Sequence, residues 1–171
     1  TGYSLKAPSD PNLFEIVRPR SGHMRFITAD VRDPCRLARE LTRSQPEVVF
    51  HLAAQSLVLQ SHCDPLTTYS TNVLGTANVL EASRKAGSVR AVVLVTSDKC
   101  YEENASGRPY RESDRLGGRD PYSGSKACAE IVAGSFPSWG AGIATARAGN
   151  VIGGGDWGKD RLIPDCVRAF S

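Results

Sequence analysis

The sequence lacks any apolar run that approaches the ~20 consecutive residues of a membrane-spanning helix, and no secretory signal precedes the globular pattern. Its 21 Lys and Arg and 18 Asp and Glu leave a net charge of only +3. The charges of opposite sign are interspersed, and no basic cluster carries the aromatic residues typical of nucleic-acid binding. We therefore expect neither a membrane nor a nucleic acid as a partner.

Paired cysteines are also missing. The five cysteines stand at positions 35, 63, 100, 128 and 166, so none forms a CxxC metal or redox pair, and an odd number cannot pair fully within the chain. This pattern predicts reduced thiols, a cytoplasmic location and no metal site. Cys100 follows three polar residues, but no partner base is evident, so a small buried hydrophobe is the better interpretation than a nucleophile.

Strand-like and helix-like segments alternate along the 171 residues, with no repeat or linker between them. Apolar runs predict strands over 24–30, 47–54, 90–97 and 142–151. Apolar spacings of three and four, with Asp-Pro starts at 33 and 120, predict helices over 33–45, 65–86 and 120–136. The alternation predicts one α/β domain with a doubly wound parallel sheet, and the continuous run 47–54 is typical of a strand buried on both faces.

The stretch "VTSDKCYEE" sets a hydroxyl, a carboxylate and an amine side by side, at Ser97, Asp98 and Lys99, directly after a predicted strand. Ligands of such sheets bind beyond the carboxyl ends of the strands. We therefore expect this tripeptide to face a ligand. The polar stretch 102–118 that follows has the length of a functional loop.

The stretch "YSGSK" places Tyr122 and Lys126 four residues apart, on one face of a predicted helix. A nearby ammonium favours the phenolate, and such a tyrosine can take a proton from an alcohol while a cofactor takes the hydride. Alone the pattern is weak, because any helix can carry a surface Tyr–Lys pair by chance. Its position after the strand-end tripeptide favours the catalytic interpretation.

Long motifs now show a resemblance. The series "ADVRD", "HLAAQ", "TNVLGT", "VTSDK", "YSGSK" and "RAGNVIGGG" resembles the extended short-chain dehydrogenase/reductases that act on nucleotide sugars. Within them, "TSDKCYE", "GGRDPYSGSKACAE", "RAGNVIGGGDW" and "DRLIPD" resemble the CDP-glucose 4,6-dehydratase family, from end to end of the chain. The resemblance implies a Rossmann-type, NAD-binding domain over 1–171 that is incomplete at both ends, with 150–171 leading into the substrate-binding region.

The resemblance also implies a reaction, in which C4 of CDP-glucose is oxidised with NAD, water is lost across C5 and C6, and C6 is then reduced. Tyr122 would be the base for the C4 hydroxyl, Lys126 would tune it and bind the nicotinamide ribose, and Ser97 would hydrogen-bond the C4 oxygen. Asp98 and Lys99 would handle the elimination. A neutral Lys99 as the base toward C5 is favoured slightly, and it requires burial in a closed site; a charged Lys99 that stabilises the enolate is the alternative.

Further residues carry over by position. The cofactor would contact Asp30, Val31, Leu52, Ala53, Ala54, Gln55 and Asn72, besides Tyr122 and Lys126. The substrate would contact Ser97, Asn150 and Arg161. Each has a plainer alternative: the alanines could serve tight packing, Asn72 could tie a helix to a loop, and Arg161 could be a solvated charge. His51 is better interpreted as a satisfied core histidine.

Two other interpretations stay open. A 4-epimerase of the same superfamily would share Tyr122 and Lys126 but would not need Asp98 and Lys99, and a non-catalytic dinucleotide-sensing module would need none of the four.

The glycine-rich phosphate turn expected before Thr1 is absent, and "TGYSL" has no acid for the adenosine ribose, so NAD over NADP depends on the resemblance. The family also implies a homo-oligomer that pairs helices 65–86 and 121–137.

Overall fold

The computed structural model describes residues 1–17, 24–104 and 107–170, which divide into two compact units. The smaller unit combines Thr1–Asp30 with Asn150–Ser171, and the larger unit is Val31–Gly149. We describe each unit by itself.

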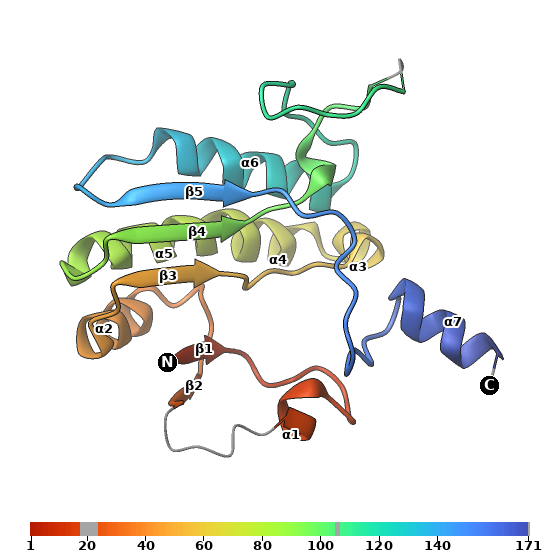
Figure 1. Cartoon of the computed structure of the whole chain (residues 1–171), viewed down its shortest axis with the longest axis horizontal. Helices are drawn as coiled ribbons and strands as arrows, with labels where there is room; N and C mark the ends of the chain where they lie inside the picture. The colour runs from red at the N-terminus through yellow and green to blue at the C-terminus, as the bar shows by residue number, and fades with distance from the viewer. Residues whose placement is uncertain (18–23, 105–106, 171) are drawn as a thin grey trace. The chain divides into compact units, whose positions relative to one another are not determined.

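A three-stranded parallel sheet forms the centre of the larger unit (Figure 1). Its strands are β3 (Val48–His51), β4 (Ala91–Val95) and β5 (Gly142–Ala146), in the order β3-β4-β5. Val48 pairs with Ala91, and Ala91 pairs with Gly142, so the three strands begin level with one another. Their carboxyl ends therefore also meet at one edge, where parallel α/β sheets bind ligands.

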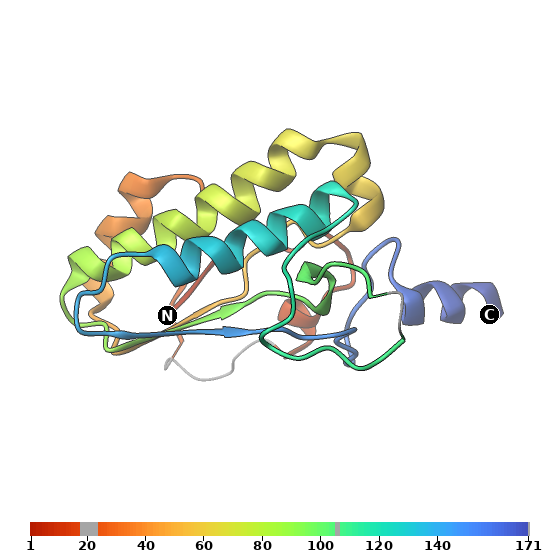
Figure 2. The same ribbon diagram turned by 90° about the horizontal axis from the view of Figure 1, so that it is seen from above.

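Helices α2 (Pro34–Ser44), α5 (Gly75–Ala86) and α6 (Pro121–Ser135) all lie over the same face of this sheet (Figure 2). The core lies between the helices and the sheet. It is formed by Leu80, Ala86, Val89, Val92, Leu94 and Ala133. Leu80 of α5 is fully buried, and Val92 and Leu94 are buried because alternate residues of β4 point to the covered face.

The opposite face of β3 is open within the described chain. Val48 is 47% exposed and Phe50 is 66% exposed. The expectation that 47–54 is buried on both faces is therefore wrong for these residues, since none of the helices of the larger unit lies on that face. The run is apolar throughout, as a doubly covered strand would be, but only one of its faces is covered here.

The helix ends follow the predicted signals. Asp33 accepts a hydrogen bond from the Arg36 backbone N–H at 2.9 Å, and Asp120 accepts one from Ser123 N at 2.9 Å. A proline follows each capping aspartate, where its missing N–H costs no hydrogen bond. Gly87 ends α5 with a φ of 73°, the left-handed conformation that glycine adopts without strain.

The predicted helix 65–86 is continuous but changes its winding. It consists of α4 (Pro65–Tyr69), a π-helical turn η1 (Ser70–Leu74) and α5. Asp64 caps its start through a 3.0 Å hydrogen bond from Thr67 N. A short helix that the sequence did not predict, α3 (Val58–Cys63), precedes it.

The smaller unit holds a parallel pair of strands, β1 (Gly2–Ser4) and β2 (Phe26–Thr28), with helices α1 (Leu13–Val17) and α7 (Leu162–Phe170). β1 was not predicted. The strands predicted over 24–30 and 142–151 are confirmed in type but are shorter, at Phe26–Thr28 and Gly142–Ala146. Among the described residues, no helix is both long and apolar enough to cross a bilayer.

Candidate functional site

The polar tripeptide lies at the carboxyl end of β4, in a short 3-10 turn, η2 (Asp98–Cys100). Ser97 is buried and caps this turn by accepting a hydrogen bond from Lys99 N at 3.2 Å. Its hydroxyl also lies 3.1 Å from Asp98 Oδ1, to which it donates. Asp98 N donates to Ala148 O at 3.0 Å, which fixes the turn to the segment after β5. The side chains of Asp98 and Lys99 are exposed.

The first two turns of α6 carry Tyr122 and Lys126, both buried. Lys126 Nζ donates to Val95 O at 3.0 Å, so the helix is tied to the last residue of β4, two residues before Ser97. Burial lowers the pKa of the Lys126 ammonium below its usual value. The structure thus brings Ser97, Tyr122 and Lys126 to the same edge of the sheet.

Asn72 in η1 connects that edge to α6. It accepts from Gln55 N at 2.8 Å, and it donates to Gln55 O at 2.9 Å and to Ser125 Oγ at 2.8 Å. Ser125 Oγ in turn donates to Tyr122 O at 2.7 Å. Both amide hydrogens of Asn72 are therefore used within the protein. Its side chain fixes the loop after β3 and the backbone of the helix that carries the tyrosine.

The segment Leu52, Ala53, Ala54 and Gln55 leaves the end of β3 as a loop, and Leu52 is 67% exposed. The Gln55 side chain bonds to Leu57 and to Thr68 Oγ1, the latter at 2.8 Å. The predicted cofactor-contacting segment is thus held at its far end by Asn72 and Thr68, next to the edge that carries Ser97.

His51 is a satisfied core histidine, as predicted. Its Nε2 lies 3.2 Å from Thr76 Oγ1, and that hydroxyl donates its own hydrogen to Asn72 O at 2.7 Å. The hydroxyl can therefore only accept from His51, which assigns the proton of the neutral imidazole to Nε2. Burial, and after it the charge of Lys126, lowers the pKa of His51 from 6.5 to about 4.

Cys100 is fully buried. Burial, and after it the charge of Glu130, raises the pKa of its thiol to about 11. A thiol without thiolate character is not a nucleophile. The structure thus agrees with the sequence-based interpretation of Cys100 as a buried hydrophobe.

The remaining predicted residues fall on both units. Val31 is buried in the larger unit, where its backbone carbonyl accepts from Asn78 Nδ2 at 2.9 Å. Asp30, Asn150 and Arg161 belong to the smaller unit. Asp30 accepts from Tyr3 Oη through its backbone carbonyl, at 3.0 Å. These three residues remain predicted contacts.

An ion pair beside the site was missed from the sequence. Glu130 on α6 and Arg147 after β5 are joined at 2.8 Å, with side chains 4% and 17% exposed. Burial alone would raise the pKa of Glu130, but hydrogen bonds from Arg147, Thr96 and Thr145 outweigh it and lower the pKa. Seventeen residues and a change from helix to strand separate the pair, so no local spacing reveals it.

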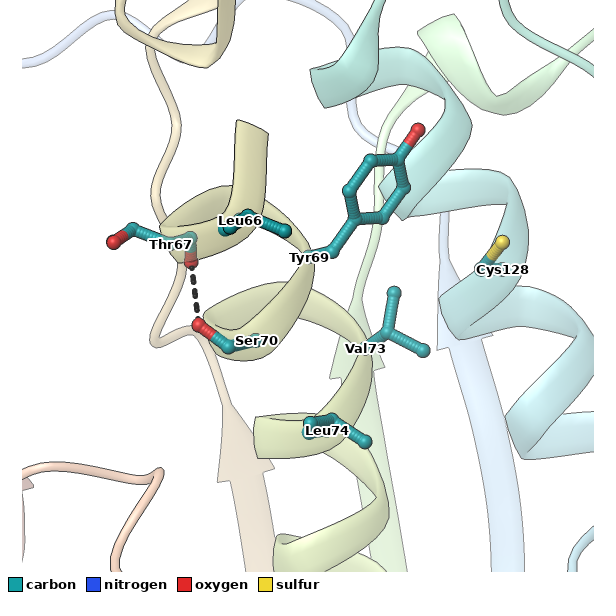
Figure 3. Close-up of a pocket in the computed structure, with 7 residues that line it drawn as sticks. All are labelled: Leu66, Thr67, Tyr69, Ser70, Val73, Leu74 and Cys128. Carbon is teal, nitrogen blue, oxygen red and sulfur yellow. Dashed lines mark hydrogen bonds between the residues drawn. The ribbon is translucent and has the colours of Figure 1, made fainter. Parts of the chain in front are cut away.

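A shallow apolar groove of about 520 Å³ lies on the outer side of the helices (Figure 3). Cys128 of α6 lines one side of the groove. The other side is lined by residues of α4 and η1: Leu66, Thr67, Tyr69, Ser70, Val73 and Leu74. Leu66 is 81% exposed and Leu74 is 61% exposed. The groove lies on the two helices that the sequence predicts to form a subunit interface.

Comparison with known proteins shows the family of this chain. A family model described as GDP-mannose 4,6 dehydratase matches residues 9–147, a span that includes the turn η2 and both residues of the Tyr–Lys pair. The chain belongs to this dehydratase family. CDP-glucose 4,6-dehydratase of Salmonella typhimurium is 50% identical over 99% of this chain and 50% of that protein. A UDP-glucose 4-epimerase of Mycolicibacterium smegmatis is 36% identical over 65% of this chain and 35% of its own.

Solved structures agree on the fold. A dTDP-glucose 4,6-dehydratase of Streptomyces venezuelae, solved with NAD bound, matches with a TM-score of 0.79 at 33% identity, over 88% of this chain and 45% of that chain. The predicted Rossmann-type parallel α/β fold is therefore confirmed. The chain spans half or less of the length of the curated relatives that it matches. It is a family member that corresponds to part of those proteins.

Proposed function

We propose that this chain carries the catalytic, NAD-binding part of a CDP-glucose 4,6-dehydratase, a lyase that forms CDP-4-keto-6-deoxyglucose. One observation carries the proposal. An acid and an amine, Asp98 and Lys99, follow Ser97 at the end of β4, while Lys126 ties the tyrosine-bearing helix to that same strand end. The Salmonella relative supports the cytidine nucleotide, since half of the aligned residues are identical over almost the whole chain.

The residues present suit a bound dinucleotide. The Lys126 ammonium has three N–H groups. One donates to Val95 O, and within the described residues the other two have no hydrogen-bond acceptor. The remaining donors would bind the nicotinamide ribose, and the short side chains of Ala53 and Ala54 would leave space for the cofactor. Val31 and Gln55 would line the rest of the cofactor site. NAD would supply the oxidation at C4 and the reduction at C6 that this dehydration requires.

The chain's own residues then move protons at three atoms of the sugar. Tyr122, as the phenolate that the buried Lys126 ammonium stabilises, removes the proton of the C4 hydroxyl and becomes the neutral phenol. On substrate binding, the Ser97 hydroxyl would turn its single hydrogen from Asp98 Oδ1 to the C4 oxygen, which orients the hexose. The C4 ketone acidifies the hydrogen on C5, and Asp98 and Lys99 serve the elimination, in which that proton is removed and the departing C6 hydroxyl is protonated.

The exposure of Asp98 and Lys99 bears on which of them moves protons in the elimination. The described chain does not bury Lys99, and burial was the condition that a neutral lysine base requires. The backbone N–H of Asp98 donates to Ala148 O, which fixes the backbone that carries the carboxylate, and Asp98 Oδ1 accepts from Ser97 in the chain without substrate. This favours Asp98 as the group that moves protons, with Lys99 as a cation beside the developing enolate.

The proposal is tested with the complete protein, NAD⁺ and four substrates offered separately: CDP-, UDP-, dTDP- and GDP-hexoses. We expect a 4-keto-6-deoxy product from CDP-glucose at the highest kcat/KM. Tyr122→Phe is the control for non-enzymatic product. Conversion of CDP-glucose to its C4 epimer, with no ketone released, would instead establish the epimerase. Binding of NAD⁺ without turnover of any nucleotide sugar would establish a sensing module.

Substitution of Lys99 separates the two elimination mechanisms. If Lys99 is the base, Lys99→Met should oxidise C4 and retain NADH but should not exchange the C5 hydrogen with solvent deuterium. If Lys99 stabilises the enolate, exchange at C5 should be slowed but measurable, and Asp98→Asn should abolish it. Mass spectrometry of the sugar after brief incubation in D₂O measures both outcomes.

We also propose that a second copy of this chain covers the apolar groove on α4, η1 and α6. The exposed leucines of the groove belong to the two helices that the family resemblance pairs across a subunit interface. Leu66→Glu in the complete protein should shift sedimentation from dimer to monomer, because a buried unpaired charge opposes association. Leu59→Glu is the matched control, since Leu59 is 63% exposed on α3 outside the groove. An unchanged dimer in Leu66→Glu would contradict the proposal.

A further inference from the structure

Arg147 joins four segments of the larger unit through one guanidinium group. Its Nη2 donates to Glu130 Oε2 on α6 at 2.8 Å. Its Nη1 donates to Tyr101 Oη at 2.9 Å and to the backbone carbonyl of Glu112 at 2.9 Å. Arg147 itself directly follows β5. Helix α6, the end of β5, Tyr101 and the polar loop at Glu112 therefore meet at this side chain.

The Glu130 carboxylate, which accepts from Arg147, is itself held by further hydrogen bonds. Glu130 Oε2 also accepts from Thr145 Oγ1 at 2.9 Å, and Glu130 Oε1 accepts from Thr96 Oγ1. Thr96 belongs to the residues that lead from β4 into η2, and Thr145 belongs to β5. The carboxylate is thereby fixed to both strands, one helical turn beyond Lys126 on α6.

Tyr101 connects this network to the proposed elimination pair. It directly follows η2, and its backbone N–H donates to Asp98 O at 3.4 Å. The Arg147 guanidinium lies 4.8 Å from the centre of the Tyr101 ring, and the ring of Tyr110 stacks on Tyr101 at 4.6 Å. Both the ring and the hydroxyl of Tyr101 are therefore held, so the turn that carries Asp98 and Lys99 has a fixed end.

We propose that Arg147 is a positioning residue for the elimination step, which it serves by fixing η2 relative to α6 through Tyr101 and Glu130. The inference rests on the proposed function. A buried ion pair is weak evidence for stability, because desolvation offsets most of the attraction, whereas its fixed geometry can determine a conformation. The oxidation step depends less on Arg147, because Lys126 is tied to Val95 and Ser97 belongs to the end of β4.

Two mild variants test the network in the complete protein. Tyr101→Phe removes only the hydroxyl contact and keeps the stacked ring. Arg147→Lys keeps a cation beside Glu130, but one ammonium cannot also replace both contacts of Nη1. We expect single-turnover C4 oxidation of CDP-glucose to stay within a few-fold of wild type. Elimination, followed as C5 deuterium exchange and product formation, should fall on the order of tenfold to a hundredfold, with 4-keto-glucose accumulating.

The double variant Tyr101→Phe/Arg147→Lys should be no slower in elimination than Arg147→Lys alone, because both changes break the same connection. Arg84→Lys is the control, since Arg84 forms an exposed ion pair with Glu81 on α5. It should change neither step. Equal losses of oxidation and elimination in the two test variants would show a merely structural role and overturn the inference.

Hydrogen exchange of the intact protein separates this inference from the proposed function. Amides of residues 98–101 should exchange faster in both variants than in wild type, while amides of α5 should not change. Unchanged exchange at 98–101 would refute the positioning role even if the enzyme acts on a different sugar. A wild-type protein that makes no ketone, with faster exchange at 98–101 in the variants, would refute the proposed function and leave the connection to η2 established.

Discussion

Acidification should destabilise the protein through His51, a residue outside the proposed chemistry. The folded protein holds its imidazole neutral, with a pKa of about 4 against 6.5 for an ordinary histidine, because burial and Lys126 disfavour the imidazolium. The unfolded chain binds a proton more readily in this range. The contribution of His51 to the free energy of unfolding is therefore fully present above the pKa of the unfolded chain. It is lost as the pH falls from about 6.5 toward 4.

The loss can be worked out from these two values. The full difference of 2.5 pKa units corresponds to about 3 kcal/mol, of which about 2 kcal/mol falls between about pH 7.5 and pH 5. His51→Gln removes the titration but keeps an N–H that can donate to Thr76 Oγ1. Urea unfolding of wild type and variant, at both pH values and one protein concentration, isolates the contribution, since other groups titrate in both proteins.

The expected result is a wild-type free energy of unfolding that falls by about 2 kcal/mol more than that of His51→Gln between these pH values. An identical pH dependence in the two proteins would refute the assignment of a buried neutral imidazole. A variant that loses more stability than wild type on acidification would reverse the sign and refute it as well.

Three further predictions use other parts of the molecule. Tyr122→Phe should lower kcat by about 10²–10⁴-fold while NAD⁺ binding, measured by calorimetry, persists, because only the proton acceptor is removed; near wild-type turnover would exclude this role. Alkylation followed by peptide mass spectrometry should modify Cys100 at least about 100-fold more slowly than the exposed Cys35, because its pKa of about 11 leaves little thiolate; comparable rates would contradict its burial. Leu80→Ala should lower the free energy of unfolding by about 2–5 kcal/mol, since the fully buried side chain leaves a cavity in the core; a loss below 1 kcal/mol in urea unfolding would contradict that packing.

The sequence predicted the parts of the fold that depend on local signals. The Asp-Pro pairs at 33 and 120 begin helices in the structure because aspartate, unlike most residues, can accept from the first free backbone N–H groups. The apolar run 91–95 became β4 with its alternate residues buried. α3 was missed because its first turn has no side-chain cap, and β1 was missed because a three-residue strand of Gly, Tyr and Ser has no apolar pattern.

The sequence predicted only those parts of the candidate site whose residues are neighbours in sequence or lie on one helix face. Tyr122 and Lys126 were predicted from their spacing, and Ser97 was predicted from its place after a strand. The contacts of Arg147 with Glu130 and Tyr101 join residues 17 and 46 positions apart, so they exist only once β4, β5 and α6 are packed. The contacts of Asn72, in the π-helical turn, with Gln55 and Ser125 likewise join residues 17 and 53 positions apart.

The open face of β3 has a practical consequence for recombinant work on residues 1–171. β3 is an edge strand of the three-stranded sheet, so one row of its backbone groups has no partner within that sheet. Val48 and Phe50 add exposed apolar side chains to the same strand. An exposed apolar edge strand is a template for intermolecular pairing and aggregation. Expressed alone, residues 1–171 should therefore be recovered largely in insoluble form, and Phe50→Lys should raise the soluble yield.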